Sequence, residues 1–345
     1  MTKQMMAAVL YGKENLKVEP VAVPSIDSGD ILVRVKAALT CGTDVKVFRR
    51  GYHARMIVPP ALFGHELAGD VVSVGAGVRR FSPGDRVVAA NSAPCGQCFY
   101  CRKGNENLCD DLLFNNGAYA EYMRIPARIV EKNTYRIPDH IHYQDAALIE
   151  PLACVLRGLE ETGLRAGDTV SVIGLGPIGL MFVRLAKIRG ARVIAIGRRR
   201  SQVDRAAQIG ADDLLVSDGT DIVSECRRLT SGYGVDVAIE AVGIPETWEQ
   251  AVRMVRRGGT VNFFGGCPSD SRISLETQLL HYSEITCKAS FHHTPRHVQE
   301  ALDIVSRGEI TAVDFVNRVE PLTNLLEVMR HLMSHNGHMK TAIIP

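Results

Sequence analysis

The sequence predicts an α/β protein in which a β-rich region is followed by a doubly wound parallel sheet. The first observation is an apolar run that ends in a cluster of glycines, VSVIGLGPIG (170–179). The second is a series of short strand patterns, broken by Gly, Pro and Asp, from Met6 to about Ile129; the third is an alternation of strand and helix patterns after Asp145. Frequent short strands favour a compact β domain, and strand–helix alternation favours a parallel sheet covered by helices.

The bulk composition is that of an ordinary globular enzyme. A length of 345 residues favours two domains, and 46% apolar with 23% charged residues is typical of a soluble chain. The net charge of +2 gives no argument for nucleic acid or an anionic membrane as a partner. Since no apolar run approaches the roughly 20 residues of a membrane span and the N-terminus has no long apolar signal core, we expect a cytoplasmic protein.

The elements follow from local patterns. In the β-rich region, Ile31–Ala37 alternates, Leu67–Val74 is a strand candidate and GDRVVAA after Pro83 is another. A helix is predicted over AALIEPLACVLRGLEETG, with Pro151 in its first turn or interrupting it. The later strand candidates are Val235–Glu240, Thr260–Phe264 and Ile285–Phe291, and a last helix is expected in HHTPRHVQEALDIVSRG.

The glycine cluster has the spacing of a dinucleotide-binding turn. Gly174 permits a sharp turn, Gly176 lets the backbone approach a pyrophosphate, and Gly179 lets the following helix pack on the strand. Pro177 and Ile178 stand at the helix start, where free amides face phosphates. Glycine-rich turns also occur as plain structure, but here a strand precedes the motif and a helix pattern, Leu180–Arg189, follows it.

The residues after the next strand pattern, Ala191–Ile196, favour NADP over NAD. NAD sites usually have an acidic residue at this point, which bonds the ribose 2′-hydroxyl. Here Gly197 is followed by Arg198, Arg199 and Arg200, and guanidinium groups match a 2′-phosphate. The alternative is that GRRR is a solvated turn and that NAD binds through other groups.

Four cysteines predict a structural metal site. Cys95, Cys98, Cys101 and Cys109 have the spacing CxxCxxCx7C, and four thiolates close a tetrahedral zinc site. A common iron–sulfur run ends in a three-residue gap followed by Cys-Pro, whereas the last gap here is seven residues and Asp110 follows. The spacing therefore favours zinc over an iron–sulfur cluster and over four unconnected loop cysteines.

A dispersed set of residues is suited to a second zinc that keeps an open position. Cys41, His65, Glu66 and Glu150 supply a thiolate, an imidazole and one or two carboxylates. Asp44 could orient His65, or it could be a helix cap or turn residue. Singly, each residue is unremarkable, since a histidine beside a glutamate is more often a surface pair or a satisfied core group. Five further histidines are expected at the surface: His140, His142, His331, His335 and His338.

Five motifs follow one another along the chain: CGTD, GHE, the four-cysteine lobe, EP and GxGxxG. In this order and at these separations they resemble the zinc-dependent medium-chain alcohol dehydrogenases, and the resemblance covers essentially the whole chain. The branch with sorbitol, other polyol and threonine dehydrogenases is the most similar, because GHE contains glutamate and EP supplies a carboxylate. The resemblance implies a GroES-like catalytic domain over 1–151, with a zinc lobe at about 91–112, a Rossmann domain over 152–290, and a return to the catalytic domain over 291–345. It also implies a cleft between the two domains and a homodimer or homotetramer.

The resemblance also implies roles for single residues. Cys41 and His65 would be catalytic zinc ligands, and the carboxylate would come from Glu66, from Glu150, or from each in different steps. Thr43 stands where the family places a hydroxyl that takes the substrate proton, although it could be a turn hydroxyl. Lys46 stands where many members have a relay histidine; it could pass a proton, touch substrate or cofactor, or simply be solvated.

The function expected from these features is hydride transfer between a secondary alcohol, on a polyol, cyclitol or sugar derivative, and NADP. The alternatives are an NAD-dependent polyol or threonine-type dehydrogenase, a dedicated ketone reductase, and a non-catalytic dinucleotide-binding sensor. A sensor would need broken chemistry, whereas the predicted ligand set is complete.

Overall fold

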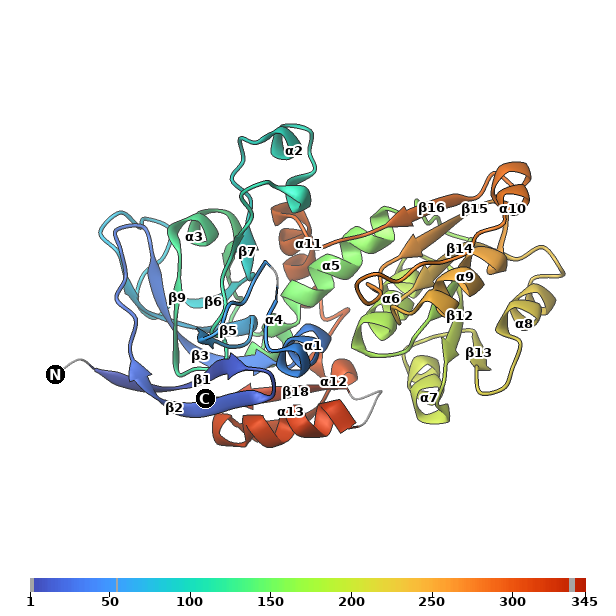
Figure 1. Cartoon of the computed structure of the whole chain (residues 1–345). Coiled ribbons are helices and arrows are strands. Elements are labelled where there is room, and N and C mark those ends of the chain that lie inside the picture. The colour runs from blue at the N-terminus through green and yellow to red at the C-terminus, as the bar shows by residue number, and fades with distance from the viewer. Residues whose placement is uncertain (1–2, 54, 335–338) are drawn as a thin grey trace. The chain divides into compact units, whose positions relative to one another are not determined.

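The computed structural model describes residues 3–53, 55–334 and 339–345, and its chain forms two compact units (Figure 1). The first consists of Met1–Ala153 with His293–Pro345, and the second of Cys154–His292. The chain thus leaves the first unit after Ala153, where the sequence suggested 151, and returns after His292, where it suggested 290. His335 and His338, expected at the surface, lie outside the described residues.

The first unit is built mainly on antiparallel strands, and one pair at the edge of its larger sheet is parallel. A three-stranded sheet has the order β2-β1-β4, a larger sheet has the order β10-β6-β5-β3-β18-β17 with β9 also on β3, and β7 pairs with β8. The strands are β1 (Gln4–Gly12), β2 (Asn15–Ala22), β3 (Ile31–Leu39), β4 (Ala61–Leu62), β5 (Glu66–Val74), β6 (Arg86–Ala89), β7 (Ser92–Ala93), β8 (Leu113–Phe114), β9 (Tyr122–Ile125), β10 (Thr134–Arg136), β17 (Val316–Pro321) and β18 (Lys340–Ile344).

Strand β3 is the centre of the larger sheet. Buried and more exposed residues alternate along β3, and the buried ones include Ile31, Val33 and Val35. These three belong to the hydrophobic core of the unit, which also contains Phe48 and Tyr119. The C-terminal strand β18 pairs antiparallel with the end of β3, at Ala342↔Leu39. The last residues of the chain therefore lie beside the segment that leads into Cys41.

The helices of the first unit are short, and α5 runs across the boundary to the second unit. Pro151 lies in the first turn of α5, where the missing N–H costs no helical bond. The helices are α1 (Gly42–Arg50), α2 (Phe99–Arg102), α3 (Ala127–Asn133), α4 (Tyr143–Ala147), α5 (Ile149–Glu160), α11 (Pro295–Ser306), α12 (Ala312–Phe315) and α13 (Leu325–Ser334), with 3₁₀ turns η1 (Glu106–Leu108) and η2 (Leu322–Asn324).

The second unit is a parallel six-stranded sheet with the order β13-β12-β11-β14-β15-β16. This is the 3-2-1-4-5-6 order of a Rossmann fold, in which the chain changes direction between β11 and β14. The fold class predicted from the sequence is confirmed. The strands are β11 (Thr169–Ile173), β12 (Arg192–Gly197), β13 (Asp213–Val216), β14 (Val235–Glu240), β15 (Val255–Phe263) and β16 (Thr286–Ala289).

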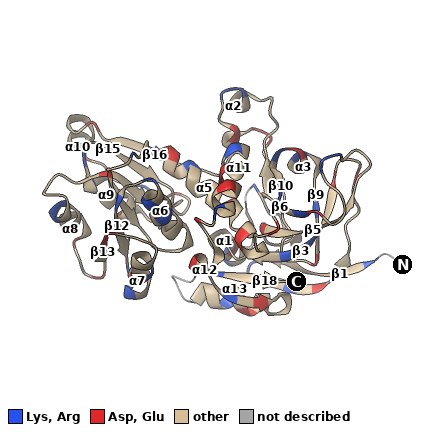
Figure 2. Ribbon diagram, turned by 180° about the vertical axis from the view of Figure 1, so that it is seen from behind, with Lys and Arg blue, Asp and Glu red and all other residues tan. Residues whose placement is uncertain are grey.

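Helices connect these strands and pack on the sheet. The core of the unit joins Ile173, Ile194 and Val261 from three strands to Ala251 of α9. The helices are α6 (Pro177–Ile188), α7 (Arg200–Gln208), α8 (Ile222–Leu229), α9 (Pro245–Met254) and α10 (Thr277–Tyr282). Acidic and basic positions are interspersed along the ribbons of both units, in keeping with the small net charge (Figure 2). None of the described helices has the length and hydropathy that a membrane crossing requires.

Candidate functional site

Cys41 is fixed at the start of α1, directly after β3. It is the N-cap residue, and its Sγ accepts a hydrogen bond from the backbone N–H of Thr43 at 3.4 Å. Asp44 Oδ2 accepts in return from the backbone N–H of Cys41 at 3.0 Å. This reciprocal arrangement is a capping box with cysteine in place of the usual hydroxyl residue. The helix start therefore orients the thiol and recruits Asp44 to the same place.

Asp44 also orients His65. The carboxylate is 1% exposed, and its Oδ1 lies 3.0 Å from His65 Nδ1. The hydroxyl of Tyr119 donates to Asp44 Oδ2 at 2.6 Å. With Nδ1 engaged by a carboxylate, the histidine presents Nε2 as its ligand atom, as zinc-bound histidines do. The expected orienting role of Asp44 fits this geometry, whereas Tyr119 was missed because it stands 75 residues from Asp44.

The ligand atoms of Cys41, His65 and Glu66 all lie within 4.8 Å of one another. Burial raises the pKa of Cys41, but the hydrogen bond and charge of His65 outweigh it and bring the pKa to about 7. Burial lowers the pKa of His65, but the Asp44 carboxylate and Cys41 more than offset this and raise it well above its usual value. The Cys41 thiolate lies beside a protonated His65 imidazole. A divalent cation that binds both side chains displaces the proton from the imidazole. The donor set therefore fits a zinc ion.

Glu150 is buried in the first turn of α5 but does not belong to this 4.8 Å group. Its Oε1 lies 3.7 Å from Nε2 of His293, which is also buried and lies 3.4 Å from Asn91 Oδ1. Burial raises the pKa of Glu150 to about 7, against the attraction of His65. The structure thus brings Glu66 next to Cys41 and His65, and brings Glu150 next to His293.

Thr43 and Lys46 both lie on α1. Thr43 is half-buried two residues after the Cys41 thiol, whereas Lys46 is exposed to solvent one turn later. That Lys46 takes part in the reaction stays a prediction.

Lys340 is a buried neighbour of the site that the sequence did not reveal. Its ammonium Nζ donates to both carboxylate oxygens of Glu66, each at 2.6 Å. Burial lowers the pKa of Lys340, but the facing Glu66 carboxylate outweighs it and raises the pKa above its usual value. The two residues are 274 positions apart, so no spacing motif could have linked them.

The four cysteines of the α2 lobe, which projects from the first unit (Figure 1), also come together. Their Sγ atoms lie within 4.8 Å of one another, with 3.8 Å between Cys98 and Cys109 and 4.0 Å between Cys95 and Cys101. A tetrahedral zinc with Zn–S bonds of about 2.3 Å holds its sulfurs about 3.8 Å apart. Hydrogen bonds from the backbone of Cys101 and Asp110 lower the pKa of Cys98 to about 6. The lobe fits a closed zinc site.

The glycine turn has a distinct geometry at each of its three positions. Gly174 has φ +96°, in the left-handed region. A Cβ on Gly176, the N-cap of α6, would meet no atom within 4 Å, whereas one on Gly179 would lie 1.7 Å from the carbonyl oxygen of Gly174. The turn is therefore tight at the first glycine, open at the second and closely packed at the third, as a pyrophosphate-binding turn requires. Pro177 and Ile178 begin α6.

The arginine run lies beside this turn. Strand β12 is the parallel neighbour of β11 and ends at Gly197, where an added Cβ would lie 2.9 Å from Leu175 Cδ1 of the turn. Arg200 forms an i,i+4 ion pair with Asp204 at 2.8 Å. Arg198 is exposed and Arg199 half-buried. Arg198 and Arg199 are therefore the two candidates for binding a phosphate.

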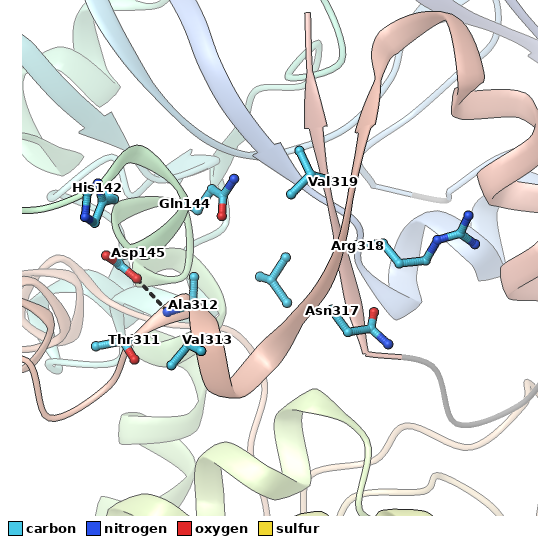
Figure 3. A pocket seen from close by; sticks show the side chains of 10 residues that line it. His142, Gln144, Asp145, Thr311, Ala312, Val313, Asn317, Arg318 and Val319 are labelled. Carbon is cyan, nitrogen blue, oxygen red and sulfur yellow. Dashed lines mark hydrogen bonds between the residues drawn. The ribbon is translucent and has the colours of Figure 1, made fainter.

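A separate pocket of the first unit includes none of the predicted site residues (Figure 3). It lies between the start of α4 and the segment from α12 into the sheet-edge strand β17, and Asp145 bridges the two by accepting a hydrogen bond from the Ala312 N–H. Its lining residues are His142, Gln144, Asp145, Thr311, Ala312, Val313, Val316, Asn317, Arg318 and Val319.

Comparison with known proteins gives matches along the whole chain. The alcohol dehydrogenase GroES-like domain family matches residues 27–139, and the zinc-binding dehydrogenase family matches residues 177–307. Sorbitol dehydrogenase of Bacillus subtilis is 31% identical over 99% of this chain and 98% of its own. L-threonine 3-dehydrogenase of Bacillus licheniformis is 37% identical over 73% of each chain. A Sinorhizobium meliloti 1021 protein, described as a zinc-binding dehydrogenase and solved with NADP bound, is 32% identical over all of both chains with a TM-score of 0.91.

Proposed function

Because the chain belongs to the zinc-dependent medium-chain alcohol dehydrogenase family, we propose that it transfers a hydride between a secondary alcohol and NADP. The observation that supports this most is the cluster of Cys41, His65 and Glu66, whose ligand atoms lie within 4.8 Å of one another; Glu150 is a further buried carboxylate of the same unit. One thiolate and one carboxylate balance the charge of a divalent ion, and one neutral imidazole completes a set of three protein ligands. Three protein ligands leave the fourth coordination position open for a substrate.

The catalytic zinc would be held by Cys41, His65 and a carboxylate from Glu66 or Glu150. When bound, zinc supplies Lewis-acid chemistry that lowers the pKa of an alcohol oxygen. Asp44 keeps the His65 ring in its ligand orientation through the 3.0 Å contact with Nδ1. The hydroxyl of Thr43, which lies on the same helix start as Cys41, would relay the alcohol proton: it takes this proton and releases its own proton to solvent. A second zinc would be held by Cys95, Cys98, Cys101 and Cys109 and would stabilise their lobe.

The cofactor would bind at the glycine turn. The amides at the start of α6 receive the pyrophosphate, with Gly176 allowing close approach. Arg198 and Arg199 bond the 2′-phosphate of NADP at the end of β12. The NADP bound by the Sinorhizobium meliloti relative supports this choice. When bound, the nicotinamide supplies the hydride acceptor.

The substrate we propose is a polyol, cyclitol or sugar derivative, because sorbitol dehydrogenase matches nearly the whole chain. A threonine-type dehydrogenase is the second candidate, since L-threonine 3-dehydrogenase has the higher identity over a shorter stretch. As the family resemblance suggests, we also propose a homodimer or homotetramer.

The experiment that tests this function is a substrate panel on zinc-replete protein. Polyols, cyclitols, sugars, threonine and simple secondary alcohols are each assayed with NADP and with NAD. We expect turnover of a polyhydroxylated substrate with a higher kcat/KM for NADP. Preference for threonine would favour the second candidate, and turnover of none, at full zinc content, would favour the sensor.

Replacing both Arg198 and Arg199 by serine should lower kcat/KM for NADP by roughly 100-fold or more, because each of the two charge-assisted bonds to a phosphate is worth about 1.5–3 kcal/mol. The value for NAD should change little. Arg200→Ser is the matched control, since this arginine is paired with Asp204. An equal loss with both cofactors would show that the arginines do not read the 2′-phosphate.

A further inference from the structure

We propose that Glu240 is a positioning residue for the cofactor, whose buried carboxylate holds the turns after β14 and β15 in place for the nicotinamide half of NADP. The inference rests on the proposed function and deepens it, because it assigns a further residue to cofactor binding. Glu240 belongs neither to the glycine motif nor to the arginine run.

Glu240 ends the strand that lies beside β11, at the point where the strand order of the sheet changes direction. It is opposite Ile173 of β11 on one side and Phe263 of β15 on the other. In a doubly wound sheet a dinucleotide binds outside the carboxyl ends of the strands at this point, and each half of the sheet receives one mononucleotide. The glycine turn and the arginine run belong to the half with β11, β12 and β13. The turns after β14 and β15 therefore lie on the half that receives the nicotinamide mononucleotide.

One oxygen of the Glu240 carboxylate closes the turn that follows β14. Oε1 accepts from the backbone N–H of Val242 at 2.8 Å and from that of Gly243 at 2.9 Å. It also accepts from the hydroxyl of Thr247, in the first turn of α9, at 2.7 Å. Glu240 is fully buried, so water does not compete for these bonds. The carboxylate therefore ties the turn after β14 to the start of α9.

The other oxygen of the carboxylate faces the turn that follows β15. A Cβ on Gly265 would lie 2.7 Å from Glu240 Oε2 and 2.4 Å from the backbone nitrogen of Gly243. A Cβ on Gly243, whose φ is +83°, would lie 2.6 Å from the carbonyl oxygen of Gly266. The indole N–H of Trp248 donates to the Gly265 carbonyl at 2.9 Å. No side chain fits at Gly265 or Gly243, so the backbones of the two turns are in direct contact beside the carboxylate.

The turn after β14 also packs against the glycine turn of the cofactor site. A Cβ on Gly174 would lie 2.6 Å from Val242 Cγ2 and 3.1 Å from the carbonyl carbon of Ala241. The N–H of Ala241 donates to the Ile173 carbonyl at 2.8 Å. Without the carboxylate, the N–H of Val242 would lose its buried acceptor, which is costly unless the turn moves. The surface that receives the nicotinamide half would then no longer be fixed.

The test measures the binding of NADPH and of adenosine 2′,5′-bisphosphate to the full-length protein by calorimetry. Trp248 is the single tryptophan of the chain, so energy transfer from its indole to the reduced nicotinamide gives a second measure of NADPH binding. We expect Glu240→Ala to raise the Kd for NADPH roughly 10- to 100-fold, because hydrogen bonds to a buried carboxylate are lost. The Kd for the bisphosphate should change less than about threefold, because this ligand has no nicotinamide and binds to the other half of the sheet.

Glu240→Gln is the conservative variant that should restore binding. Its amide oxygen can accept the same three hydrogen bonds. Burial raises the pKa of Glu240 above its usual value in spite of those bonds, so an uncharged side chain suits this position. The Kd for NADPH should stay within about threefold of the wild-type value.

Asp30→Ala is the matched control. The Asp30 carboxylate is also buried, and it also accepts from two backbone N–H groups, those of Asp27 and Ala127, each at 2.9 Å. It belongs to the first unit, whereas the glycine turn belongs to the second. The control should therefore lose stability without a change in either Kd.

The outcomes separate this inference from the function on which it rests. If the wild-type protein binds neither NADPH nor NADH, both are overturned. If it binds only NADH, the choice of NADP is overturned, and the same comparison with NADH and AMP decides the role of Glu240. If it binds NADPH and Glu240→Ala binds it equally well, only the role of Glu240 is overturned.

Two further results would overturn the role of Glu240. One is an equal weakening of both ligands in Glu240→Ala, and the other is a loss in Glu240→Gln as large as that in Glu240→Ala. Should Glu240→Ala fail to fold, Thr247→Val still decides, because it removes one of the three bonds to Oε1. A Kd for NADPH raised about threefold or more, with the bisphosphate unaffected, would support the role, and an unchanged Kd would overturn it.

Discussion

Cys41→Ser is expected to lower kcat/KM about a thousandfold, the loss that corresponds to about 4 kcal/mol of transition-state stabilisation. Cys41 supplies the only sulfur of the catalytic cluster among the described residues. Serine keeps the helix cap, because its hydroxyl can accept from the Thr43 N–H. The change therefore removes the metal ligand and spares the local fold. The measurement is steady-state kinetics together with zinc content per chain.

The control for this variant is Cys287→Ser, on the exposed strand β16. It should retain both activity and zinc. Cys41→Ser should lose the catalytic zinc and keep the zinc of the four-cysteine lobe, whose ligands it does not touch. Full turnover by Cys41→Ser would refute hydride transfer through a zinc held at Cys41.

The parts of the fold that the sequence predicted well are those set by local patterns. The alternation in β3 and the apolar run into Gly174 each depend on residues that are neighbours in the chain. The roles expected of Gly174, Gly176 and Gly179 follow from backbone geometry over six residues, and the structure has the matching geometry. The sequence predicted a strand that begins at Thr260, whereas β15 begins at Val255. The two glycines at 258 and 259 hide the strand pattern before Thr260.

The parts of the site that escaped prediction depend on tertiary contacts. Lys340 opens an apolar strand and has no motif around it; only the pairing of β18 with β3 brings it to Glu66. Tyr119 reaches Asp44 across 75 positions of sequence in the same way. Such residues are distant partners of buried groups that stand in a motif, so a buried carboxylate in a motif indicates that a partner exists but not which one.

Cys109→Ser is expected to remove the zinc of the α2 lobe and to lower the Tm by about 5 °C or more, since each 1 kcal/mol lost shifts the Tm by a few degrees in units of this size. Cys109 is fully buried, and its Sγ accepts from the backbone N–H of Cys95 at 3.2 Å.

The lobe has little apolar core to replace a metal. Residues of α2 are not buried, and Phe99 and Leu108 are 60% and 43% exposed. Its order must therefore come from the ligands and the N–H···S bonds, such as that from Cys98 N–H to Cys95 Sγ at 3.3 Å.

Limited proteolysis should cut the variant between residues 91 and 112, while the catalytic zinc is retained. Cys226→Ser, buried in the second unit, is the control: it should lose stability without losing zinc or exposing the lobe. Wild-type Tm and protease resistance in Cys109→Ser would show that the four thiolates do not hold a structural ion.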